Sequence, residues 1–163
     1  MLMPVEAIKG EDETDTELLN KMAVQARNYI TSFKWCLPIT AMYLADGIGG
    51  IIAIFLVEFD GKIDGTDDRL WVVVGDLPPA YMVVESDDCA REALERYCLL
   101  MDDWVNAVRG NGDFGSAYPV SAPRTEEYAD MLQSRLDTLR ESIIPEFSTE
   151  IVNPSESENQ SPN

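Results

Sequence analysis

Residues 69–85 read RLWVVVGDLPPAYMVVE and contain two β-type runs separated by a compact turn. The runs are residues 70–74 and 80–84, and each combines valines with an aromatic residue, a composition typical of strands. Between them, Pro78 and Pro79 cannot donate to a sheet ladder, and a proline biases the residue before it away from helix. This stretch therefore predicts a β-hairpin, and we expect the rest of the chain to cover it.

A third strand is predicted immediately before the hairpin. Residues 51–59 are apolar without alternation until Glu58, and a strand of this kind is normally covered on both faces. The Asp- and Gly-rich residues 60–68 then provide a turn. Because short connections place sequential strands side by side, we expect a three-stranded antiparallel meander.

Helices are predicted on both sides of the meander. Apolar residues at helical spacing indicate three longer helices, over residues 15–35, 88–109 and 125–144. A capping box at Thr14 and Glu17 marks the start of the first. A short helix is expected over residues 38–45, since Pro38 suits a first helical position and Gly47 suits a helix stop.

The predicted fold is α+β, with a three-stranded antiparallel β-meander covered by three longer helices and one short helix, in the order α-α-β-β-β-α-α. The helices over residues 88–109 and 125–144 should share one face of the sheet, and the first helix should close the other face or an edge. With 163 residues and 45% apolar content, one core is expected. We expect a flexible leader at residues 1–14, a single domain at 15–147 and a disordered acidic tail at 148–163.

The chain is strongly acidic, with 30 acidic and 12 basic residues, no histidine and a formal net charge of −18. Residues 15–147 alone contain 23 acidic and 11 basic residues, a net charge of −12. This charge repels phosphate backbones and anionic lipids, so we expect neither nucleic-acid nor membrane binding. It favours a basic protein partner, although acidity that serves only solubility explains it equally simply.

The cysteines and the N-terminus predict a cytoplasmic protein. Cys36, Cys89 and Cys98 are too widely spaced for a Cys-x-x-Cys metal site and too few for a disulfide framework. The first residues lack the basic start and long apolar run of a signal peptide. Residues 51–57, the longest apolar run, are too few to cross a bilayer as a helix.

Asp46 and Asp76 are the candidate catalytic residues. Each ends a predicted element beside a glycine, where partial burial would raise the pKa of a carboxylate and suit it to acid–base work or to holding Mg²⁺. In the simpler alternative, Asp76 accepts backbone hydrogen bonds in its own turn. The absence of histidine excludes Ser–His and Cys–His nucleophiles and imidazole zinc sites.

No metal or cofactor site is predicted. Residues 60–68 have carboxylates at alternate positions, as an EF-hand loop does, but Lys62 occupies the third position and Trp71 the twelfth, where calcium ligands are required. The glycines of residues 47–50 precede a strand, whereas a phosphate-binding loop precedes a helix. A solvated turn explains each segment.

The hairpin turn also offers candidate binding residues, which are Trp71, Asp76, Pro78, Pro79, Tyr81 and, from a later loop, Tyr118. Exposed aromatic residues of this kind commonly anchor interfaces. The opposing interpretation places Trp71 beneath the helices. The sequence leaves both open.

Four segments resemble a family of short bacterial proteins with no assigned activity. They are ITSFKWC at residues 30–36, AMYLADGIGGIIAIFLVEF at 41–59, LWVVVGDLPPAYMV at 70–83 and APRTEEYADMLQSRLDTLRESIIPEF at 122–147. In that family an ADGIG-like segment precedes a WVVVGDLPPAY-like one. The resemblance covers residues 20–147 and implies a bacterial cytosolic setting and one domain, with no catalytic residues.

These observations favour a binding protein over an enzyme. The leading hypothesis is an acidic protein-binding module, immunity-like or regulatory, for a basic partner. The alternative is a small hydrolase or ligand-binding protein that uses a carboxylate site around Asp46 and Asp76, with Mg²⁺ as the cation such a site would hold.

Overall fold

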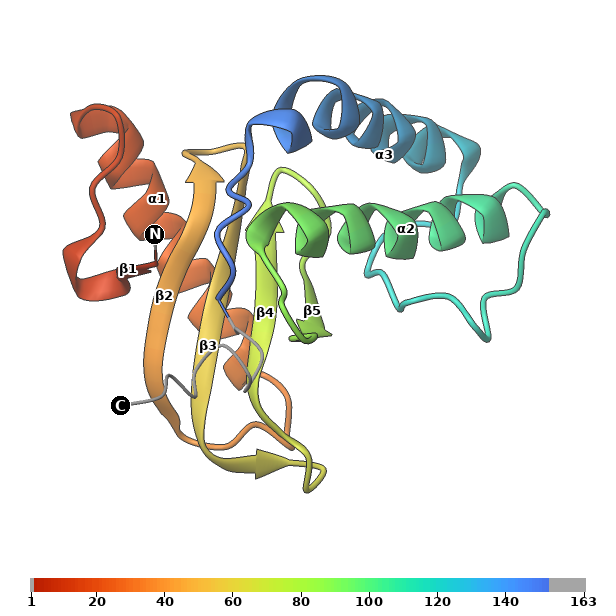
Figure 1. The fold of residues 1–163 in the computed structure, drawn as a ribbon. Helices are drawn as coiled ribbons and strands as arrows, with labels where there is room; N and C mark the ends of the chain where they lie inside the picture. The colour runs from red at the N-terminus through yellow and green to blue at the C-terminus, as the bar shows by residue number, and fades with distance from the viewer. Residues whose placement is uncertain (1, 153–163) are drawn as a thin grey trace.

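The computed structural model describes residues 2–152 and shows an α+β fold with one five-stranded antiparallel sheet and three long helices in that part of the chain (Figure 1). The strands are β1 (Met3–Pro4), β2 (Ile39–Ile48), β3 (Ile52–Ile63), β4 (Asp67–Gly75) and β5 (Ala80–Val83). The long helices are α1 (Glu13–Thr31), α2 (Ala90–Val108) and α3 (Glu126–Thr138). Strand order in the sheet follows chain order, from β1 at one edge to β5 at the other.

The predicted three-stranded meander is wrong, because two further strands extend it. The predicted strands correspond to β3, β4 and β5, and β2 lies on the other side of β3. Residues 38–45, predicted to be a short helix, belong instead mostly to β2, which pairs with β3 from Ile39 to Ile48. The pairing buries Met42 and Leu44 against α1 and occupies the otherwise open edge of β3. The free energy gained from this burial and pairing outweighs the weak local preference of these residues for a helix.

The N-terminal residues also differ from the prediction. Met3 pairs with Leu44, so β1 forms the edge of the sheet within the predicted leader. Helix α1 begins earlier than the predicted capping box, because Asp12 is the N-cap and its Oδ1 accepts the Asp15 N–H at 2.7 Å. An aspartate accepts this capping bond as readily as a threonine does.

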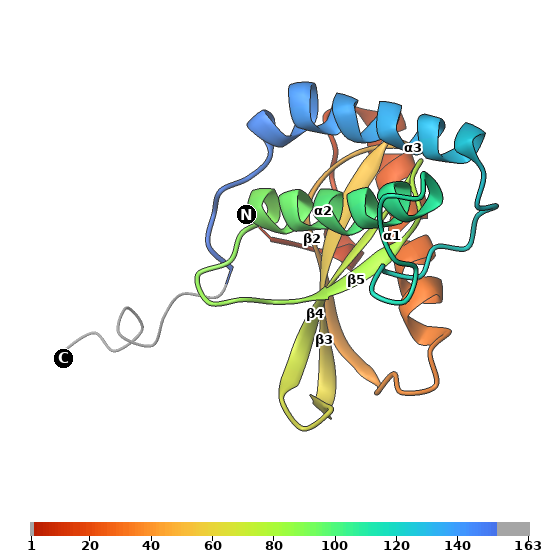
Figure 2. The ribbon, with the colours of Figure 1, turned by 90° about the vertical axis from the view of Figure 1, so that its right-hand side faces the viewer.

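The sheet lies between two helical layers, with α1 on one face and α2 on the other, and α3 packs against α2 (Figures 1 and 2). Along β3, Ile52, Ile54 and Leu56 contact the α2 layer. The alternate residues Ala53 and Phe55 contact the α1 layer. Helices on both faces explain why this strand is apolar without alternation.

After α3 the chain continues through a π-helical turn (Leu139–Ile143) and a 3₁₀ turn (Ile144–Glu146), then runs back along the molecule. The Ser148 N–H donates to Asp46 Oδ2 at 2.8 Å, and the Val152 N–H donates to the Asp88 carbonyl at 2.9 Å. The first residues of the predicted tail are therefore hydrogen-bonded to β2 and to the segment before α2. Residues 153–163 of that tail lie outside the described residues.

Candidate functional site

A cavity of about 710 Å³ opens where β4 turns into β5. Its walls come from the end of α1, the β4–β5 turn, α2, the loop after α2, and α3. Most of the side chains that line it are apolar or aromatic. Pockets for small molecules typically have volumes of roughly 300–1,000 Å³ and linings of this kind.

Five of the six predicted binding residues line this cavity, namely Asp76, Pro78, Pro79, Tyr81 and Tyr118. Trp71 does not, because it is fully buried beneath α2 and its Nε1 donates to Asp88 Oδ2 at 2.9 Å. Asp46 is also elsewhere. Its two carboxylate oxygens accept the N–H groups of Gly47 and Ser148, at 2.8 Å each. The structure therefore brings Asp76, but not Asp46, to the pocket.

The turn that forms one wall depends on a glycine. Gly75 has φ +155°, and a Cβ on this residue would lie 2.2 Å from the Ile51 carbonyl oxygen. Only glycine allows the backbone to approach this closely, so the end of β4 lies directly against the β2–β3 turn. There the Asp76 N–H donates to the Ile51 carbonyl oxygen at 2.9 Å. Across the turn, the Tyr97 hydroxyl donates to the Pro78 carbonyl. Both ends of the proline-containing wall are thereby fixed.

One end of the cavity is aromatic. The Tyr29 and Tyr118 hydroxyls are 2.8 Å apart, and the Tyr118 hydroxyl also accepts the Tyr81 N–H at 3.1 Å. The Tyr81 ring contacts Phe33 and Tyr118, with centroids 5.2 and 5.9 Å apart. Burial, with the mutual hydrogen bond, raises the pKa of Tyr29, and burial raises that of Tyr118. Both phenols are therefore neutral at physiological pH.

The charged residues of the described lining are Asp76 and Arg135. Arg135 Nε lies 3.0 Å from Asp76 Oδ2, and its NH1 donates to the Met131 carbonyl at 3.4 Å. The Arg135 side chain is 37% exposed and that of Asp76 is 67% exposed. The ion pair therefore lies at the mouth of the cavity, open to solvent.

The sequence did not single out several lining residues, notably Tyr29, Phe33, Trp104 and Arg135. Trp104 is on the apolar stripe of α2, and Tyr29 is near the end of α1. In the sequence, each resembles an ordinary core residue of its helix. Arg135 is one of several arginines on helical surfaces. No local pattern separates these residues from their neighbours, because the pocket arises only when segments distant in the sequence meet.

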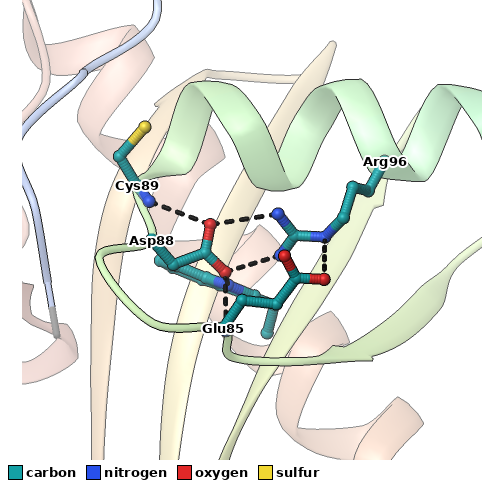
Figure 3. Close-up of polar contacts among 5 residues, drawn as sticks. Glu85, Asp88, Cys89 and Arg96 are labelled. Carbon is teal, nitrogen blue, oxygen red and sulfur yellow. Dashed lines mark hydrogen bonds and ion pairs between the residues drawn. The ribbon is translucent and has the colours of Figure 1, made fainter.

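A second polar cluster surrounds Asp88, which is 1% exposed (Figure 3). Its carboxylate accepts hydrogen bonds from Trp71 Nε1, the Glu85 and Cys89 N–H groups, and both terminal nitrogens of Arg96, at 2.6–3.1 Å. Burial alone would raise the pKa of Asp88, but the bonds from Arg96, Glu85 and Trp71 outweigh it and lower the pKa. All these partners belong to the protein, so the cluster holds β4, β5 and α2 together.

The described residues contain no group of three or more His, Cys, Asp or Glu side chains placed to hold a metal ion. Cys36, Cys89 and Cys98 are free thiols, and burial raises the pKa of Cys98 to about 11. Within residues 2–152, none of the helices combines the length and apolar character that crossing a membrane requires.

Comparisons of the chain with protein-family models, curated protein sequences and solved structures gave no match. The resemblance to a family of short bacterial proteins stays a prediction. The class that the structure defines is an α+β protein with a largely apolar pocket at the β4–β5 turn.

Proposed function

We propose that this protein binds a small, largely apolar molecule in the cavity at the β4–β5 turn. The observation that carries the proposal is the cavity itself, with its volume of about 710 Å³ and its aromatic and aliphatic lining. Burying apolar ligand surface against such a lining supplies the affinity, at about 25 cal/mol per Å² removed from water.

Binding, rather than hydrolysis, is the activity that the residues support. The predicted hydrolytic site needed Asp46 and Asp76 together, whereas Asp46 binds Gly47 and Ser148, and Asp76 pairs with Arg135. Asp76 retains a role at the mouth of the cavity, where it holds the Arg135 guanidinium in place. We therefore propose ligand binding, and we do not propose hydrolysis by Asp46 and Asp76.

A defined set of neutral probes tests the pocket. Indole, 2-naphthylmethanol and 1-decanol should each cause saturable chemical-shift changes in the Trp104 indole N–H and in neighbouring amides. Replacing Ser121, an exposed residue of the lining, with tryptophan should fill the cavity and abolish these changes. Ser134→Trp is the matched control, because Ser134 is exposed on α3 outside the lining. If no probe gives a saturable change, or if both variants behave alike, the proposal is wrong.

The charge of the chain supports a second candidate function, that of an acidic module for a basic protein partner in the cytoplasm. The observation is the net charge of −12 over residues 15–147, which would speed association with a cationic surface and disfavour nucleic acid and anionic membranes. Affinity purification from the native cytosol at about 150 mM salt should recover a basic protein that dissociates at about 1 M salt. Recovery of no basic protein, or of one insensitive to salt, would remove this candidate.

A further inference from the structure

We infer that the ligand is a carboxylic acid with an apolar body, and that Arg135 binds its carboxylate. This inference rests on the proposed ligand-binding function and specifies the ligand. It follows from the side-chain N–H and O–H groups of the cavity lining that have no partner among the described residues.

Arg135 supplies most of the unused donors. A guanidinium has five N–H bonds, and Arg135 uses one at Nε for Asp76 and one at NH1 for the Met131 carbonyl. Its other N–H bonds have no partner among the described residues. They are one at NH1 and two at NH2. Arginine binds a carboxylate through two parallel N–H bonds from two different nitrogens, and NH1 and NH2 each retain at least one.

The tyrosine pair leaves one further O–H donor free among the described residues, whichever of the two hydroxyls donates in the bond between them. Tyr29 and Tyr118 share one hydrogen bond, and the Tyr118 oxygen also accepts the Tyr81 N–H. The two phenols carry two hydrogens, of which the shared bond uses one. The second has no partner among residues 2–152, and both tyrosines line the cavity.

Trp104 provides a third donor. This residue is 2% exposed, lines the cavity, and has an indole N–H with no partner among the described residues. Every fully enclosed side-chain nitrogen or oxygen in that part of the chain does have a hydrogen-bond partner. The indole nitrogen is therefore not fully enclosed, and it belongs to a residue that lines the cavity.

Asp76 is the carboxylate of the described lining, and one of its oxygens already binds Arg135. A cationic ligand would compete with the Arg135 guanidinium for Asp76, whereas a carboxylate would pair with the guanidinium N–H bonds that Asp76 does not use. The donors explain how a protein with net charge −18 can bind an anion locally.

Four ligands with one apolar body separate the head-group chemistry from the pocket. Decanoate, decanamide, 1-decanol and decylammonium should be titrated into the full chain by calorimetry at neutral pH. We expect decanoate to bind about tenfold to a hundredfold more tightly than 1-decanol, the range that charge-assisted hydrogen bonds give, and decylammonium to bind most weakly.

The variant Arg135→Gln should remove the preference for decanoate over 1-decanol. Arg109→Gln is the matched control, since Arg109 pairs with Glu126 and Asp130 outside the cavity lining, and it should keep the preference. Equal binding of all four ligands, or an unchanged preference in Arg135→Gln, overturns the carboxylate assignment but leaves the pocket function standing. No binding by any of the four overturns both.

Discussion

The middle of β4 and the turn after it lie beside two polar clusters that differ in completeness. In the middle of the strand, Trp71 belongs with Asp88 to a buried cluster in which five hydrogen bonds from the protein meet one carboxylate. Beyond its end at Gly75, the cavity lining retains N–H and O–H groups without described partners. A buried polar group without a partner costs about 1–3 kcal/mol, so a fold normally completes its networks. The groups of the cavity lining are not fully enclosed, so the fold leaves them without a described partner at no such cost, and the incomplete cluster is the one we assign to a ligand.

Two tryptophans, one in each cluster, differ in the same way: one indole N–H has a partner and the other has none in the described residues. Trp71 and Trp104 are both almost fully buried in the layer between the sheet and α2. The Trp71 N–H donates to Asp88, whereas the N–H of Trp104, a residue of the cavity lining, has no partner among the described residues. The first serves folding and the second is available to a ligand.

The largest effect is expected at Asp88. Asp88→Asn should lower the free energy of unfolding by about 3–5 kcal/mol, because it leaves the Arg96 guanidinium without its buried counter-charge. Urea denaturation at neutral pH measures this value. Asp102→Asn is the control, since Asp102 pairs with Arg140 where both side chains are partly exposed, and it should cost at most about 1 kcal/mol.

The same substitution should change the response to acid. The pKa of Asp88 is lowered in the folded state, so the unfolded state takes up the proton first as the pH falls. The stability that Asp88 contributes is present above about pH 4 and is lost below it. Asp88→Asn should therefore flatten the acid limb of the stability curve. An unchanged acid limb, or equal losses in Asp88→Asn and Asp102→Asn, would show that the cluster does not stabilise the fold as we describe.

A matched pair of tryptophan substitutions tests the contrast directly. Trp71→Phe and Trp104→Phe remove the same atoms from two buried positions, so their cavity costs should be similar. Trp71→Phe also removes a hydrogen bond to a charged group, which should make it about 1.5–3 kcal/mol more destabilising. Equal losses on urea denaturation would mean that the two N–H groups do not differ as the comparison requires.

Much of the fold was predictable from local pattern, and the error arose where local pattern is weakest. Strand β3 is apolar on both faces because helices cover both, and its sequence indicated this. The prediction of a helix over residues 38–45 was wrong because Pro38 and Gly47 are as compatible with the two ends of a helix as with positions beside and within a strand. Only the open edge of β3 decides between them, and that edge is a tertiary feature.

The candidate site was predictable on one side only. Asp76, Pro78 and Pro79 lie on a single turn whose composition is unusual, and Tyr81 follows that turn in β5, so the sequence marked them. Arg135 lies on α3, and its pairing with Asp76 spans 59 residues of chain. Such a contact depends on how α3 packs against α2, which no pattern within either segment specifies.

A smaller effect is expected from the tyrosine pair, and it should appear at alkaline pH. Burial and the mutual hydrogen bond raise the pKa of Tyr29 in the folded state, so above about pH 10 the unfolded state loses its proton first. The stability from this group is complete below that pH and is lost as the pH rises. Tyr29→Phe should reduce the loss between about pH 10 and 11 by roughly 1 kcal/mol.

Urea denaturation across that pH range measures the difference. Tyr128→Phe changes the same atoms at an exposed position, and at neutral pH it should alter stability by less than about 0.5 kcal/mol. An alkaline limb that is identical in the wild type and in Tyr29→Phe would mean that the Tyr29 hydroxyl is not shielded beside Tyr118.

The smallest effect on stability is expected at Arg135, the residue with the largest expected effect on ligand choice. Its ion pair with Asp76 is open to solvent, so Arg135→Gln should change the free energy of unfolding by less than about 1 kcal/mol. Asp88→Asn removes one charge too, yet should cost several times as much, because its partners are buried or partly buried. If Arg135→Gln destabilises the protein as strongly as Asp88→Asn, Arg135 belongs to the framework and its unused N–H groups lose their significance. A guanidinium that the fold does not need, held at the mouth of an apolar cavity, is instead accounted for by what it binds.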